Sequence, residues 1–143
     1  MTIRKMTGAD RAAVLSMMRT FYASPAVFTD GSEEIFLRDI ENCTGSNPFV
    51  EGYILETEGI AAGYAMVAKS YSTEFGKPCI WIEDLYVREA FRGKGLGKQF
   101  FHFLSNQYRD CIFRLEVEAD NLPALHLYEK CGFTELPYME MKK

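Results

Sequence analysis

The feature that most constrains the fold is a strand-like run that passes through a glycine-rich loop into a helix-like run. Residues 77–87, "KPCIWIEDLYV", are rich in β-branched and aromatic side chains, as strands are. A loop with three glycines follows, then apolar side chains at helical spacing, then a second strand-like run at 112–119, "IFRLEVEA". This unit predicts a right-handed crossover that joins two parallel strands.

Patterns before this unit predict a strand, two helices and a hairpin. A short alternating run at 2–6 is the strand, and the first helix begins near Gly8 and ends before Pro25. The second helix is capped by Ser32 and is expected to turn Ile35, Phe36 and Ile40 inward. Two further strands meet at a turn around Glu58-Gly59, which makes them an antiparallel hairpin.

Patterns after the unit predict one helix and one strand. Asn121 is expected to cap the helix and Gly132 to end it as a left-handed glycine. The last strand is expected within "TELPYMEMK", residues 134–142, where Pro137 suggests an edge or a bulge. The predicted order is β-α-α-β-β-β-α-β-α-β, an α/β (α+β) class with a mixed sheet and helices on its faces.

Composition excludes several classes of function. The 143 residues carry a net charge of −4, which does not support nucleic-acid binding. No apolar run reaches the ~18 residues of a membrane span, and the start of the chain does not resemble a signal peptide. We therefore expect a single cytoplasmic domain, 1–143, without membrane or nucleic-acid partners. The four scattered cysteines are expected to be reduced, and no metal-ligand spacing is present.

The glycine loop has the sequence Arg92-Gly93-Lys94-Gly95-Leu96-Gly97 and stands where a strand ends and a helix begins. Helix N-termini present unpaired N–H groups, and glycines let them approach a ligand, so a phosphate or pyrophosphate fits this loop. The loop matches neither the Walker pattern nor the dinucleotide-binding pattern, since Gln99 and Lys98 stand where each requires another residue. The alternative is a flexible connection with solvated basic side chains.

The same six residues resemble the [RQ]-x-x-G-x-[GA] loop of the GNAT superfamily of acyl-CoA-dependent N-acetyltransferases. A second segment, 118–133, is similar to the N-x-x-A-x-x-x-Y-x-x-x-G-F pattern of that superfamily, with Asn121, Ala124, Tyr128, Gly132 and Phe133 in register. The resemblance covers almost the whole chain. It implies a mostly antiparallel sheet with a central parallel strand pair, acetyl-CoA (coenzyme A) as donor and a primary amine as acceptor.

The resemblance also implies where the cofactor binds. The backbone around the glycine loop would hold the pyrophosphate, the end of the preceding strand would hydrogen-bond the pantetheine arm, and strands 80–87 and 112–118 would separate to admit it. The implied cofactor-binding residues are Leu85, Tyr86, Val87, Arg92, Gly93, Lys94, Gly95, Leu96, Gly97, Lys98 and Asn121.

Two residues are the catalytic candidates. Glu83 would take the proton of the amine, through a water molecule, because a carboxylate in a central strand is costly without a use. Its alternative is a cap or an ion pair at an exposed strand end. Tyr128 would give a proton to the departing thiolate, since a phenol with a pKa of ~10 can donate at neutral pH. Its alternative is a core tyrosine with a satisfied hydroxyl.

The acceptor is the least constrained part of the prediction. Asp84, Tyr22 and Phe28 are the candidate substrate-binding residues, because an acidic and aromatic surround suits a cationic amine. "GKPCIWIEDLYV" is similar to the branch that acetylates polyamines, diamines and amino-acid side chains. Peptide and protein amines, aminoglycosides, acyl groups other than acetyl, and an acyl-CoA sensor without turnover stay open. The apolar C-terminal run (Leu136, Tyr138, Met139, Met141) could support a homodimer.

Overall fold

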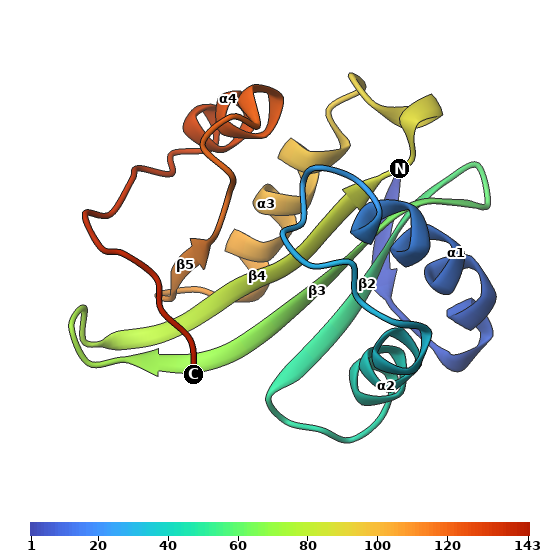
Figure 1. Ribbon diagram of the computed structural model, residues 1–143, viewed down its shortest axis with the longest axis horizontal. Helices are drawn as coiled ribbons and strands as arrows, with labels where there is room; N and C mark the ends of the chain where they lie inside the picture. The colour runs from blue at the N-terminus through green and yellow to red at the C-terminus, as the bar shows by residue number, and fades with distance from the viewer.

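The computed structural model describes all residues, 1–143, as five strands in one sheet, four α-helices and two short 3-10 turns. Figure 1 shows the sheet running through the middle of the molecule with helices on both sides. None of the helices has the length and apolar character needed to cross a membrane. In chain order the elements are β1 (Thr2–Lys5), η1 (Gly8–Asp10), α1 (Arg11–Tyr22), α2 (Glu33–Thr44), β2 (Val50–Thr57), β3 (Ile60–Ser72), β4 (Lys77–Val87), η2 (Glu89–Phe91), α3 (Leu96–Gln107), β5 (Ile112–Leu115) and α4 (Leu122–Lys130).

The strands lie in the order in which they occur in the chain, β1-β2-β3-β4-β5. The first three neighbouring pairs are antiparallel, and β4 and β5 are parallel. The predicted mixed, mostly antiparallel sheet is therefore confirmed, with α3 as the connection between its parallel strands. The parallel pair lies at one edge of the sheet and not at its centre as predicted, because no strand forms beyond β5. The fourth strand has the predicted bounds, 77–87.

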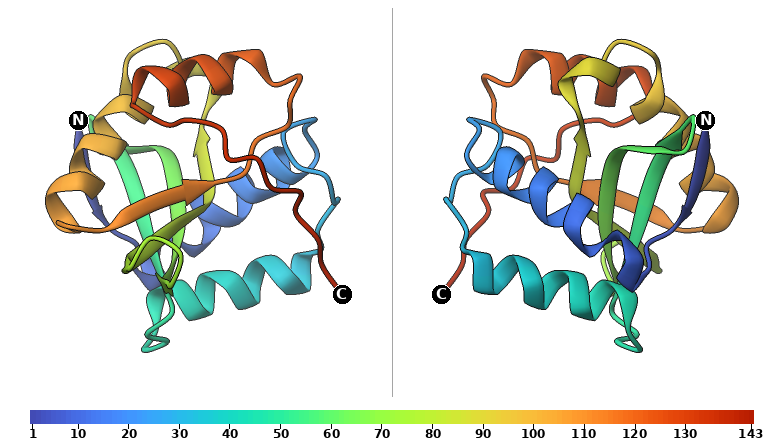
Figure 2. Two further views of the ribbon diagram at one scale, coloured as in Figure 1. Left: turned by 90° about the vertical axis from the view of Figure 1, so that its left-hand side faces the viewer. Right: turned by 90° about the vertical axis from the view of Figure 1, so that its right-hand side faces the viewer.

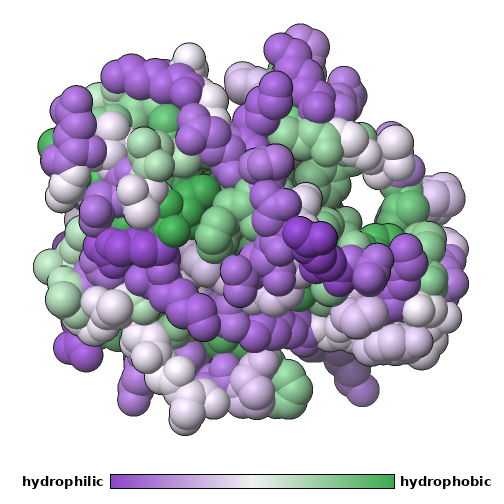
Figure 3. All heavy atoms as spheres, turned by 180° about the vertical axis from the view of Figure 1, so that it is seen from behind, coloured by the Kyte–Doolittle hydropathy of each residue, from purple (hydrophilic) through white to green (hydrophobic).

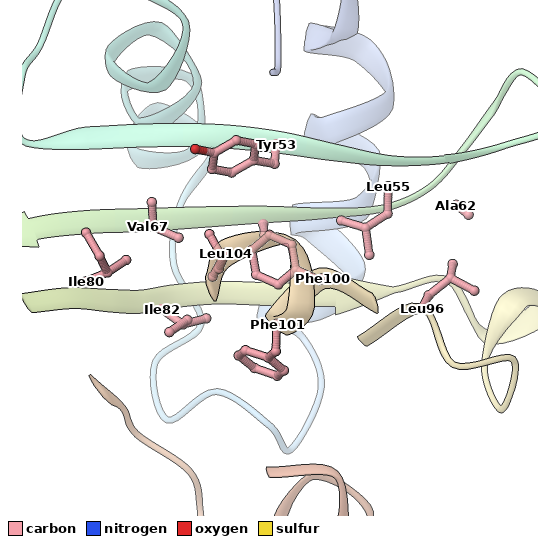
Figure 4. Packing of buried hydrophobic residues seen from close by; sticks show 11 residues of the cluster. Tyr53, Leu55, Ala62, Val67, Ile80, Ile82, Leu96, Phe100, Phe101 and Leu104 are labelled. Carbon is pink, nitrogen blue, oxygen red and sulfur yellow. The ribbon is translucent and has the colours of Figure 1, made fainter. Parts of the chain in front are cut away.

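Two hydrophobic clusters fill the two sides of the sheet. On one side, α3 presents Phe100, Phe101 and Leu104 to the strands, as Figure 4 shows. On the other side, α1 and α2 cover a cluster that includes Met18 and Phe36. The two side views in Figure 2 show the helices separated by the sheet in this way. Burial on both faces explains why β3 and β4 read as nearly continuous apolar runs.

Local signals in the sequence set several element boundaries. Ser32 accepts a hydrogen bond from the Ile35 amide at 3.2 Å and begins α2. Glu58 and Gly59 both have positive φ, 52° and 75°, as the tight turn of a two-residue hairpin requires. Gly132 follows α4 with a φ of 93°, as predicted for a glycine that ends a helix.

Other predictions were wrong. Ile35 does not turn inward: it is exposed, because Phe36 and Ile40 already form the buried stripe four residues apart. The strand predicted at 112–119 ends at Leu115. No strand forms in 134–142, where the backbone makes no hydrogen bond to the rest of the protein. An alternating pattern needs a partner strand to become one, and these residues have none.

Candidate active site

The parallel strands β4 and β5 separate part of the way along the sheet. Their pairing runs from Cys79 with Ile112 to Ile82 with Leu115 and stops there. β4 continues to Val87 without a partner on that side, while the chain after Leu115 turns toward α4. The separation expected between 80–87 and 112–118 is present. In the space-filling view the surface is hollowed on the side of the molecule where α4 lies, at the right of Figure 3.

The glycine loop lies at the end of this free stretch of β4. Gly93 and Gly95 have φ of 73° and 81°, in the region that favours glycine, and Gly95 stands directly before the first residue of α3. The backbone N–H groups of residues 93–98 donate no hydrogen bond within the protein. Six consecutive free donors at a helix N-terminus form a site for an anion.

Basic side chains surround these donors. Arg92 donates from Nε to the Val87 carbonyl at 2.8 Å, which ties the loop to the end of β4. Its guanidinium also lies 5.6 Å from the centre of the Tyr86 ring. Lys94 and Lys98 are exposed. The loop therefore combines a positive potential with hydrogen-bond donors, as an anion requires.

Gly97 has a different reason to be glycine. A Cβ at this position would lie 2.7 Å from Cδ2 of Leu127 in α4. Its φ is not positive, so the requirement is space and not backbone conformation. The missing side chain of Gly97 therefore also gives α4 room to pack on α3, beside the predicted role of its backbone in the loop.

Glu83 is the bulged residue of β4. The register passes from Val67 opposite Ile82 to Met66 opposite Asp84, which leaves Glu83 with no opposing residue. Its side chain is exposed at the point where β5 leaves β4. Partial burial of the carboxyl, followed by the charges of Asp84, Glu140 and Asp39, raises the pKa of Glu83 above its ordinary value. A raised pKa improves a carboxylate as a proton acceptor.

Asp84 occupies a different environment from its neighbour. It is 5% exposed, and its carboxylate accepts hydrogen bonds from Tyr22 at 2.9 Å and Tyr64 at 2.7 Å. Burial raises its pKa, although both tyrosine hydroxyls oppose that rise. Tyr22 is the last residue of α1, so its hydrogen bond to Asp84 joins α1 to β4.

Tyr128 lies in α4, half-buried, with its ring edge-on to Phe101 and Phe133 at 5.8 and 5.9 Å. Its hydroxyl makes no hydrogen bond to protein and is not sealed from solvent. Burial, followed by the proximity of Cys131, raises the pKa of Tyr128, so the phenol stays protonated at neutral pH. Asn121 caps α4 by accepting from the Ala124 amide at 3.4 Å.

The remaining acceptor-side predictions fall on α1, α2 and the segment between them. Phe28 is 87% exposed in that segment, which passes in front of β4 in Figure 1. Glu33 and Glu34 are exposed and ion-paired with arginines, so they belong to a solvated helix face. Asp39 is half-buried, and burial, followed by the charge of Asp84, raises its pKa. Sequence reasoning did not single out Glu140, whose proximity to Glu83 depends on the path of the C-terminal segment.

Comparisons with known proteins bear on this arrangement. The sequence model that describes the acetyltransferase (GNAT) family matches residues 15–133 of this chain. The chain is 26% identical over 137 residues to the spermine/spermidine N(1)-acetyltransferase of Bacillus subtilis (strain 168), with 92% of this chain and 86% of the relative covered. It is 34% identical over 107 residues to the thialysine N-epsilon-acetyltransferase of Sus scrofa, with 67% and 62% covered. A solved structure described as a predicted acetyltransferase with acetyl-CoA, from Clostridium acetobutylicum, superposes with a TM-score of 0.75 at 19% identity, with 99% and 95% covered.

Proposed function

Because the chain belongs to the acetyltransferase (GNAT) family and is an acetyl-CoA-dependent N-acetyltransferase, we propose that its cofactor binds where β4 and β5 separate. We further propose that residues 1–143 act as a single domain that acetylates a small cationic amine by direct attack. The observation that carries the proposal is the run of free N–H donors in residues 93–98, next to the unpaired end of β4.

The residues present fit coenzyme A. A pyrophosphate needs several hydrogen-bond donors and positive charge, which the amides of 93–98, Arg92, Lys94 and Lys98 supply together. An amide-containing pantetheine arm needs a free strand edge, which residues Leu85 to Val87 supply. Asn121, at the start of α4, lies on the other side of the separation and completes the proposed cofactor-binding set.

Acetyl-CoA, when bound, supplies an activated thioester. Glu83 accepts the proton that the amine must lose, through a water molecule, and its raised pKa suits that role. Tyr128 holds the proton that the departing sulfur takes, because its hydroxyl is protonated and uncommitted to any protein group. Glu83 comes from β4, and Tyr128 comes from α4, the helix that follows β5 in the chain.

The charges around Glu83 favour a cationic acceptor. Asp39, Asp84 and Glu140 all act on Glu83, so the acceptor side has a negative potential. Asp84 contributes to this potential from beneath the surface, while the exposed Phe28 and the half-buried Tyr22 are the aromatic rings that suit an alkylammonium group. The similarity to a spermine/spermidine acetyltransferase supports the same class of acceptor, namely a polyamine or diamine.

The cofactor part of the proposal is tested by isothermal titration of acetyl-CoA into the wild type and Gly95→Val. Because Gly95 has a φ of 81°, valine forces the loop to rearrange, and we expect affinity to fall by about tenfold or more. Gly76→Val is the matched control, since it strains a left-handed glycine of φ 65° in the β3–β4 turn. A wild type that does not bind acetyl-CoA would overturn the proposal.

The chemical part is tested by measuring thiol release with spermidine, putrescine, thialysine and a lysine peptide. We expect turnover with at least one small amine, and Tyr128→Phe to lower kcat by about 10- to 100-fold with acetyl-CoA affinity unchanged. Tyr71→Phe, at an exposed tyrosine of β3, is the control. Binding of acetyl-CoA without turnover of any amine would favour a sensor over an enzyme that acts on this class.

A further inference from the structure

The carboxylate of Asp84 is buried without a cation. It is 5% exposed, and the groups that act on it are the hydroxyls of Tyr22 and Tyr64. Burying a carboxylate costs several kcal/mol even when it is hydrogen-bonded, and an apolar residue of similar size would pack there at lower cost. Asp84 directly follows Glu83 in β4, so the geometry of this buried carboxylate bears on the position of the candidate base.

The position of Asp84 in β4 shows what that geometry controls. Before the bulge, Ile80 and Ile82 point into the cluster under α3, and after it Tyr86 points into the cluster under α1 and α2. The extra residue, Glu83, thus exchanges the two faces of the strand. Asp84 is the first residue of the second part, so whatever holds its side chain also holds the C-terminal side of the bulge.

Two anchors therefore fix Glu83. On its N-terminal side, Ile82 pairs with Val67 of β3 and with Leu115 of β5. On its C-terminal side, the Asp84 carboxylate is bound by a tyrosine from β3 and a tyrosine from α1. Both tyrosines have a pKa raised by burial and then by Asp84, so they remain neutral donors. We call Asp84, Tyr22 and Tyr64 the clamp.

We propose that Asp84, held by Tyr22 and Tyr64, is a positioning residue that keeps the bulge in place and aims the Glu83 carboxylate into the opening between β4 and β5. This rests on the proposed role of Glu83 as the base. Asp84 does not touch the substrate; it acts through its neighbour in the chain. The clamp also links the last turn of α1, on the acceptor side, to the reacting carboxylate.

The test compares Asp84→Ala, Asp84→Asn and Tyr22→Phe, with spermidine and acetyl-CoA as substrates. Misplacing a reacting group by about 1 Å costs on the order of 100-fold, so Asp84→Ala should lose kcat on that scale. The affinity and stoichiometry of acetyl-CoA binding should stay within about threefold, which shows that the protein is folded. The KM for spermidine should rise less than kcat falls, because Asp84 adds to the negative potential of the acceptor side only from beneath the surface. Asp84→Asn keeps the shape and one acceptor and should recover most of kcat, and Tyr22→Phe should give an intermediate loss.

Three results would overturn the proposal. The first is kcat within about threefold of wild type for Asp84→Ala. The second is a rise in KM for spermidine alone, which would make Asp84 a binding residue. The third is an equal loss in Asp84→Asn and Asp84→Ala, which would make charge and not geometry the cause.

Glu83→Gln separates this inference from the proposed function. If Glu83→Gln keeps its kcat, the assignment of the base fails, and the clamp proposal fails with it. If Glu83→Gln loses kcat while Asp84→Ala keeps it, the clamp proposal alone fails. A readout that needs no turnover is amide hydrogen exchange in residues 82–85, which should accelerate in Asp84→Ala and much less in Asp84→Asn.

Discussion

Glu83 and Asp84 are neighbours in the chain with opposite surroundings. One is exposed at the opening between β4 and β5, and the other is enclosed by two tyrosines. The sequence shows that two adjacent carboxylates in one strand must differ in role, because neighbouring side chains face opposite sides. The bulge decides which of them reaches the opening.

A pH prediction belongs to Glu83. The raised pKa means that Glu83 takes up a proton above the ordinary glutamate value of 4.5, so kcat should be lost as pH falls through that raised pKa. Asp39→Asn removes one of the charges that raise it and should move the acidic limb of the kcat profile to lower pH. Asp30→Asn, in the exposed segment before α2, should leave the limb in place. A limb unmoved by Asp39→Asn would contradict the electrostatic origin.

β3 and β4 approach each other at the end of β4 more closely than a side chain at Gly63 would allow. A Cβ on Gly63 of β3 would lie 2.4 Å from the Tyr86 carbonyl oxygen and 3.3 Å from the Val87 Cα. These are backbone atoms, which cannot rotate away. The close approach brings β3 against the stretch of β4 that is proposed to bind pantetheine.

Gly63→Ala should therefore act on two properties at once. We expect a loss of about 1–3 kcal/mol in the free energy of unfolding, because the strands must move apart. We also expect weaker binding of acetyl-CoA, since Tyr86 and Val87 move with β4. Urea unfolding and calorimetry measure the two effects, and Gly8→Ala, where a Cβ meets nothing within 4 Å, is the control. Unchanged stability and affinity would show that β3 and β4 can move apart at Gly63 without cost.

Across the whole molecule, one carboxylate joins the sheet to the far end of α3. Burial alone would raise the pKa of Glu51 in β2, but hydrogen bonds from Lys69, Tyr108 and Tyr53 outweigh burial and lower it to about 2. Tyr108 directly follows α3, and Lys69 belongs to β3. The hydrogen bonds to Glu51 therefore connect β2, β3 and the C-terminal end of α3, at the end of the molecule opposite the glycine loop.

The lowered pKa makes stability depend on pH in a defined window. The stabilisation is fully present above the ordinary value of 4.5 and is lost as pH falls toward about 2. Its size is on the order of 2–3 kcal/mol once solvent screening of this partly buried carboxylate is allowed for. Urea unfolding between pH 5 and 3 should show a steep loss in the wild type and a shallower one in Glu51→Gln. Glu41→Gln, at an exposed residue of α2 without an ion pair, should keep the wild-type slope.

Much of the fold was predictable because its signals are local. The turn at Glu58-Gly59, the cap at Ser32 and the bounds of β4 follow from side chains within a few residues of each other. The glycine loop was also predictable, since Gly93 and Gly95 stand where the backbone adopts positive φ. The strand predicted in 134–142 failed because its pattern needed a partner strand that the chain does not supply. Ile35 failed because Phe36 and Ile40 already form the buried stripe of α2.

The sequence by itself determined which elements form and which residue types meet at the loop, since capping, turns and hydrophobic periodicity act over short distances. Only the tertiary structure decided that β5 leaves β4 after Leu115, that Glu83 is bulged, that Asp84 is enclosed by Tyr22 and Tyr64, and that Gly97 is needed for Leu127. Each of these depends on contacts between segments far apart in the chain, and a single sequence carries no record of which distant residues touch.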